Sequence, residues 1–243
     1  FYLGNVTDDR IKRIRSVIDR DEGINSDFMP GMVNIVFQEW FSQYDSSPWI
    51  FVMILAVIFV IYLFFIGREE YILFSTGTAI MGAEMLIIFA FQVIYGYIYL
   101  RIGAVVTTFL LGLLPGAILG KNYKGSSGLM ASEVIILGLL IIFLGWITLL
   151  SIEISQIWFF IYCFLFSLCC GFQFPVIAGI MGENSHPIAR CLAADFAGAA
   201  AGTILVGAFL IPSIGIRASI VFLIFMKISS CLILIFTQRV KRV

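Results

Sequence analysis

Apolar runs long enough to cross a lipid bilayer recur along this chain from Pro48 onward. A membrane-spanning helix needs about 20 predominantly apolar residues. Because the bilayer interior offers the backbone no hydrogen-bond partners, such segments span as helices whose bonds close internally. The predicted spans are residues 49–66, 71–99, 102–120, 130–150, 157–181, 191–211 and 217–236. The sequence therefore predicts an all-α polytopic membrane protein with about seven transmembrane helices.

The composition agrees with a membrane protein and excludes several other classes. Of the 243 residues, 61% are hydrophobic and 12% are charged, whereas a soluble domain has about a quarter of its residues charged. The formal net charge is zero, so the lipid bilayer is the predicted partner and nucleic acid is not. The five cysteines and the single histidine, His186, show no metal-ligand or disulfide spacing. No metal or cofactor is predicted.

Three segments are predicted along the chain. Residues 1–30 are soluble in character and suit the tail of a soluble domain. Residues 31–47 place apolar side chains at helical spacing, which predicts an amphipathic helix at the membrane surface. Residues 48–243 form the predicted seven-helix transmembrane domain. The chain has neither an initiator Met nor a signal peptide, so we expect it to be part of a longer polypeptide.

Lysine and arginine residues are distributed unevenly between the two ends of the predicted spans. Two lie on one side, Arg101 and Arg217. Seven lie on the other, namely Arg68, Lys121, Lys124, Arg190, Arg239, Lys241 and Arg242. Cytoplasmic loops carry the excess of basic residues. The C-terminus is therefore predicted to be cytoplasmic, and with seven spans residues 1–47 lie outside the cytoplasm.

This orientation can be tested with topology reporters fused at Asn25 and after Val243. The basic excess predicts a periplasm-active reporter at Asn25 and a cytoplasm-active reporter after Val243. Cytoplasmic activity at Asn25 would contradict the predicted topology of the N-terminal segment.

Two strips of small residues predict close helix packing. "GLLPGAILG" contains Gly112, Gly116 and Gly120, and "ADFAGAAAG" contains Gly198 and Gly202. Small residues at four-residue spacing let helix backbones approach closely in a membrane. Gly112 and Gly198 are 86 residues apart, nearly the spacing between the starts of the fourth and seventh predicted spans. Two three-helix repeats, made of spans 2–4 and 5–7, would explain this spacing, and transporters contain such repeats.

A few polar side chains fall inside the predicted spans and form the candidate intramembrane site. They are Glu84, Gln92, Gln173, Asp195 and Lys227. An isolated charge at the bilayer centre costs about 2.5–3.5 kcal/mol on insertion scales. One hypothesis pairs Glu84 with Lys227 in the bundle interior. Two alternatives stay open: a neutral Glu84 bonded to a neighbouring group, or a Glu84 that binds a solute or a proton.

Several segments resemble a known family. "MGAEMLIIFAFQVIYGYIY", "LLGLLPGAILG", "GFQFPVIAGIMG" and "LAADFAGAAAGTILVGAFLIPSIG" are similar to the membrane portion of bacterial proteins that fuse a spermidine-synthase-like domain to major-facilitator-like helices. The resemblance implies a multi-pass protein of the bacterial inner membrane that follows a soluble domain. In that family, aminopropyl transfer belongs to a glycine-rich nucleotide-binding domain. No such glycine motif occurs in this chain, so no catalytic residue is predicted.

Two functions follow from these observations. The first is an integral membrane anchor or assembly subunit that holds a soluble domain, or membrane or extracytoplasmic partner subunits, at the bilayer. The alternative is a transport domain for a polyamine or another small solute, which requires acidic side chains facing a cavity. Intramembrane enzyme chemistry is the weakest interpretation, because no nucleophile, base or metal cluster is recognisable.

Overall fold

The computed structural model describes residues 48–96, 99–123, 125–149, 155–182 and 187–240. Within these ranges the chain is helical and contains no strand. The elements are α3 (Pro48–Phe65), α4 (Arg68–Tyr95), α5 (Tyr99–Lys121), α6 (Ser126–Thr148), α7 (Gln156–Met181), α8 (Pro187–Gly202), the π-helix η2 (Thr203–Leu210) and α9 (Ile211–Val240). The predictions for residues 1–30 and 31–47 lie outside the described residues.

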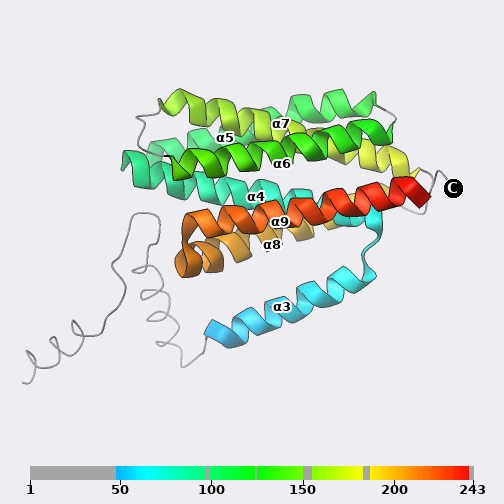
Figure 1. Cartoon of the computed structure of the whole chain (residues 1–243), viewed down its shortest axis with the longest axis horizontal. Coiled ribbons are helices and arrows are strands. Elements are labelled where there is room, and N and C mark those ends of the chain that lie inside the picture. The colour runs from blue at the N-terminus through cyan, green and yellow to red at the C-terminus, as the bar shows by residue number, and fades with distance from the viewer. Residues whose placement is uncertain (1–47, 97–98, 124, 150–154, 183–186, 241–243) are drawn as a thin grey trace, which may run out of the picture.

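Five helices in the described ranges are long and apolar enough to cross a membrane. They are Arg68–Tyr95, Arg101–Lys121, Ser126–Thr148, Gln156–Met181 and Pro187–Phe236. The last has 50 residues, but Gly215 adopts a left-handed φ of 81°. The chain turns there, and α9 runs back along the bundle (Figure 1), packed against α4 and α6.

The predicted count of seven spans is not confirmed. The two predicted spans 191–211 and 217–236 both lie in the segment Pro187–Phe236, which is one of the five although the chain turns within it at Gly215. Helix α3, predicted as the first span, is not among the five. It lies to one side of the other helices (Figure 1) and touches them through the rings of Phe59 and Tyr62 against Phe74.

Helix α5 packs closely against α7 along its glycine strip. The contacting residue numbers rise together on both helices, so the two helices run parallel. A Cβ added to any of the three glycines would clash with a main-chain carbonyl oxygen of α7: Gly112 with Phe164, Gly116 with Leu168 and Gly120 with Phe172. Backbones this close leave no room for a side chain, as the small-residue strip predicts.

Helix α8 packs against α4 in the same way. A Cβ on Gly198 would clash with the carbonyl oxygen of Phe74, and one on Gly202 with that of Thr78. On the α4 side, Gly77 faces the main-chain oxygen of Asp195. The bundle therefore contains two parallel, glycine-packed helix pairs, α5–α7 and α4–α8. The pairs meet where α4 contacts α7. Helix α6 packs against α7, α9 packs against α4, and α6 and α9 pack against each other.

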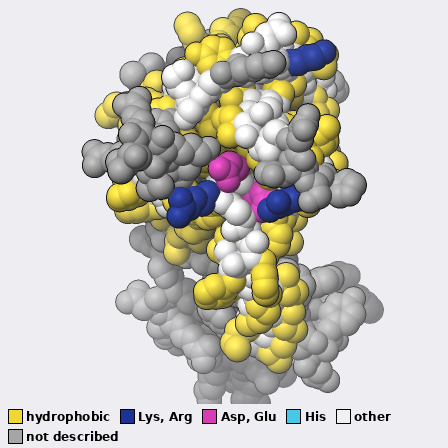
Figure 2. All heavy atoms as spheres, turned by 90° about the vertical axis from the view of Figure 1, so that its right-hand side faces the viewer, with side chains coloured by type: hydrophobic (Ala, Val, Ile, Leu, Met, Phe, Trp, Pro, Cys, Tyr) yellow, Lys and Arg dark blue, Asp and Glu magenta, His cyan; other side chains and the backbone are white. Residues whose placement is uncertain are grey.

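Basic residues gather at the end of the bundle where α4 and α8 begin and α5 ends. Arg68, Lys121 and Arg190 lie at this end, whereas Arg101 lies at the opposite one. Arg190 Nε lies 2.5 Å from Oε1 of Glu70. Figure 2, which views this end, shows acidic side chains flanked by basic ones. The side of the membrane that this end faces stays a prediction.

Candidate functional site

A buried ion pair joins α6 and α9 in the bundle interior. Lys227 Nζ lies 2.8 Å from Glu133 Oε1, and both side chains are fully buried. Lys227 also donates a hydrogen bond of 2.9 Å to Thr76 Oγ1 on α4. Burying two charges is costly unless each is paired and its remaining hydrogen-bonding capacity is used. The pair therefore depends on the polar side chains around it.

Gln173 on α7 supplies further hydrogen bonds to the network. Its Nε2 donates to Glu133 Oε1 and to Ser132 Oγ, each at 3.0 Å, and its Oε1 accepts a hydrogen bond from the Thr76 hydroxyl. The network thus joins α4, α6, α7 and α9 through side chains alone. Because charge-assisted hydrogen bonds are stronger in a low-dielectric interior, this cluster links the four helices in the arrangement observed.

The proposed pairing of Glu84 with Lys227 is wrong, since Lys227 pairs with Glu133. Glu133 was missed because the span was predicted to begin at residue 130, which placed Glu133 near the membrane surface. Helix α6 begins at Ser126, so Glu133 lies two turns inside it, with a fully buried side chain. The glutamate in "LMASEVII" is the signal that could have identified it.

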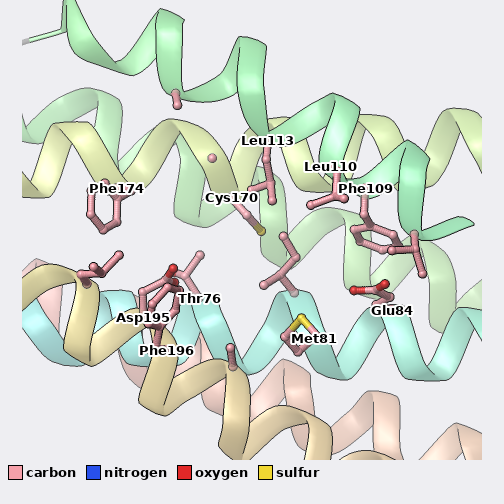
Figure 3. A pocket seen from close by; sticks show the side chains of 16 residues that line it. Thr76, Met81, Glu84, Phe109, Leu110, Leu113, Cys170, Phe174, Asp195 and Phe196 are labelled. Carbon is pink, nitrogen blue, oxygen red and sulfur yellow. The ribbon is translucent and has the colours of Figure 1, made fainter.

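A cavity of about 380 Å³ lies between the two glycine-packed pairs, next to this network. One wall belongs to α5 and α7 and the other to α4 and α8 (Figure 3). The α5–α7 wall consists of Val106, Phe109, Leu110, Leu113, Ala117, Cys170, Gly171 and Phe174. The α4–α8 wall consists of Thr76, Ile80, Met81, Glu84, Leu192, Asp195, Phe196 and Ala199.

The polarity of the cavity is one-sided. Both of its carboxylates, Glu84 and Asp195, and its hydroxyl, Thr76, lie on the α4–α8 wall, whereas the α5–α7 wall carries no ionisable group apart from the thiol of Cys170. Thr76 also bonds to Lys227, so this wall connects the cavity to the buried ion pair. Within the described part of the chain, neither cavity carboxylate has a hydrogen-bond or ion-pair partner.

The cavity opens between α5 and α8. Leu110 of α5 and Leu192 and Phe196 of α8 line it and are exposed, with 61%, 41% and 62% of their surface accessible. In a bilayer this apolar rim would meet lipid chains. The cavity thus has an exposed apolar rim on one side and the polar network on the other.

The predicted intramembrane residues lie in three separate places in the structure. Gln173 and Lys227 belong to the buried network, and Glu84 and Asp195 line the cavity. Gln92 lies apart, exposed near the end of α4 and close to Arg101. Gln92 sits in the last turn of α4, where water or lipid headgroups can solvate it.

The arrangement suits ligand binding better than bond chemistry. No cluster of three or more histidine, cysteine or acidic side chains that could hold a metal occurs among the residues described. Lys227 balances Glu133, and no described residue supplies a compensating charge to the two carboxylates in the apolar cavity. No protein-family profile, curated protein or solved structure matches this chain, so the resemblance to spermidine-synthase-like membrane proteins stays an expectation.

Proposed function

We propose that this bundle is a membrane-embedded transport domain that binds a small solute in the cavity between its two glycine-packed helix pairs. The observation that carries the proposal is the placement of Glu84 and Asp195 in that cavity without a hydrogen-bond or ion-pair partner among the described residues. Ionisable side chains inside a membrane protein are costly and commonly mark a pathway for a substrate or ion. An anchor would need neither carboxylate.

The helix contacts support this proposal, because they suit an inverted repeat of α4–α6 and α7–α9. In such a repeat α4 corresponds to α7, α5 to α8 and α6 to α9. The contact of α5 with α7 then corresponds to that of α8 with α4, and the contact of α4 with α9 corresponds to that of α7 with α6. All four contacts are present. The contacts of α4 with α7 and of α6 with α9 each join two corresponding helices, so exchanging the units leaves them unchanged. A unit of three passes reverses direction in the membrane when repeated, as in many secondary transporters.

The repeat suggests how the solute site would gain access to each side. The α5–α7 and α4–α8 pairs are each held by backbone contacts, so each moves as one body. Rocking one pair against the other would open the cavity first at one end of the bundle and then at the other. The hydrogen bond between Thr76 and Gln173 crosses the boundary between the pairs and would have to adjust during this motion.

Two-sided labelling of the cavity tests the proposal without knowledge of the solute. In a variant whose five native cysteines are replaced by alanine, Leu113→Cys places one thiol on the cavity wall (Figure 3). We expect a membrane-impermeant maleimide to label this thiol from either side of proteoliposomes. A thiol at Ile135, an exposed position on α6 outside the cavity, provides the control and is expected to resist labelling within lipid.

Labelling of Leu113→Cys from one side only, or from neither, would contradict transport. That result would favour the anchor or assembly function, which one observation supports. Ten large apolar side chains among those described on α3 are exposed, and contiguous apolar surface of this kind marks contact with lipid or with another subunit.

A further inference from the structure

We propose that the cavity selects a linear dication with an apolar middle, of the class of α,ω-diaminoalkanes. This inference rests on the proposed solute-binding function and names the solute class. It is carried by the position of the two unpaired carboxylates along the cavity and by the apolar surface between them (Figure 3).

The two carboxylates lie at different levels of the bundle. The main chain of Asp195 faces Gly77 of α4, and Glu84 lies seven residues further along the same helix. At 1.5 Å of rise per residue, the two positions are about 10 Å apart along the helix axis. With bond lengths near 1.5 Å, an extended eight-carbon chain with a nitrogen at each end is about 11 Å long. A diamine of this length can therefore reach both carboxylates.

The cavity surface between the two carboxylates is apolar. On the α4 side it consists of Ile80 and Met81, and Phe109 and Leu113 line the opposite wall. The transfer of a methylene chain from water to this apolar surface is favourable in free energy. A charged nitrogen in the middle of the chain would lose its hydration without gaining a partner, which is strongly unfavourable. The cavity therefore discriminates against polyamines with internal amino groups.

The charges of the site match this ligand class. Within the bundle interior, Glu133 is neutralised by Lys227, and Glu84 and Asp195 are not neutralised by any described residue. A dication cancels both charges, whereas a monoamine leaves one carboxylate unmatched. A dicarboxylate would be repelled.

Calorimetric titration of the full chain in lipid nanodiscs tests the inference, with empty nanodiscs as the blank. The probes are 1,8-diaminooctane, 1-aminooctane, 1,8-octanediol and spermidine. We expect 1,8-diaminooctane to bind at least tenfold more tightly than the monoamine and than spermidine, and the diol not to bind above the blank. Across diamines of four to twelve carbons, affinity should peak near eight.

Substitutions separate the two charge contacts. Glu84→Gln and Asp195→Asn should each reduce the affinity for 1,8-diaminooctane to that of 1-aminooctane. Glu69→Gln, in the first turn of α4 and outside the cavity, should leave it unchanged. If either variant fails to fold, the chain-length series in the wild-type protein still decides the question. Affinity that rises steadily with chain length, or spermidine binding as tightly as the diamine, would overturn the inference.

The two proposals fail in distinguishable ways. Two-sided labelling of Leu113→Cys together with absence of diamine binding would leave transport in place and remove the diamine class. Diamine binding with labelling from one side only would establish the ligand and remove transport.

Discussion

Replacing Gly116 or Gly202 with alanine is expected to abolish stable folding of the bundle. In each case the new Cβ would overlap a main-chain carbonyl oxygen of the neighbouring helix, Leu168 for the first and Thr78 for the second. A side chain can rotate away from a clash, but a helix backbone cannot. The two helices must separate, and we expect a cost of about 3 kcal/mol, the upper part of the range for overpacked cores. Monodisperse yield and melting temperature in detergent measure the effect.

Gly138→Ala provides the matched control. A Cβ at this position in α6 meets nothing within 4 Å, so only the helix propensity changes. Alanine is favoured over glycine by about 0.8–1.0 kcal/mol in helix interiors, and this variant should therefore be at least as stable as the wild type. Normal yields of both Gly116→Ala and Gly202→Ala would show that the glycine contacts do not hold the two pairs together.

Breaking the ion pair between Lys227 and Glu133 is also expected to destabilise the folded protein strongly. Either Lys227→Met or Glu133→Gln leaves a buried group without its partner, and such single replacements typically cost about 3–5 kcal/mol. The double variant removes both charges and keeps an acceptor for Gln173. We therefore expect its destabilisation to be much smaller than the sum of the two single effects. A double-mutant cycle in detergent, followed by denaturant unfolding, gives the coupling energy.

The ion pair of Arg190 and Glu70 provides the comparison within the same protein. The Arg190 side chain is 49% exposed, and water screens such pairs to about 1 kcal/mol or less. Its coupling energy should be several-fold smaller than that of the buried pair. Additive effects of Lys227→Met and Glu133→Gln would mean that the two charges do not stabilise each other.

The sequence predicted the helical class and the close-packing glycines but not the partners of its polar residues. Apolar length determines that a segment is a helix, and small-residue spacing shows which face packs closely, because both are local properties of the chain. Neither specifies which helix is the neighbour. Lys227 is bonded to Glu133 and Thr76, which lie 94 and 151 residues away in sequence, and only the arrangement of the bundle brings them together.

Two local errors had physical causes. The predicted start of α6 is four residues late, since "KNYKGSSG" has the composition of a loop, and this places Glu133 near the end of the predicted span. Gln92 was grouped with Glu84 because both occur in one apolar run. Eight residues separate them, more than two helical turns, which places Gln92 at the end of α4 rather than beside the cavity.

The pairing of α4 with α8 and of α5 with α7 also affects how the chain is made. Helices α4 and α5 are synthesised before the helices they pack against, because both partners lie in the second half of the sequence. The glycine-packing face of α4 stays uncovered from Tyr95 until α8 begins at Pro187. At roughly 5–20 residues per second of synthesis, this delay is on the order of ten seconds. During it α4 must be shielded by lipid or by the insertion machinery, and residues 68–148, expressed without the second half, should not assemble into a stable bundle.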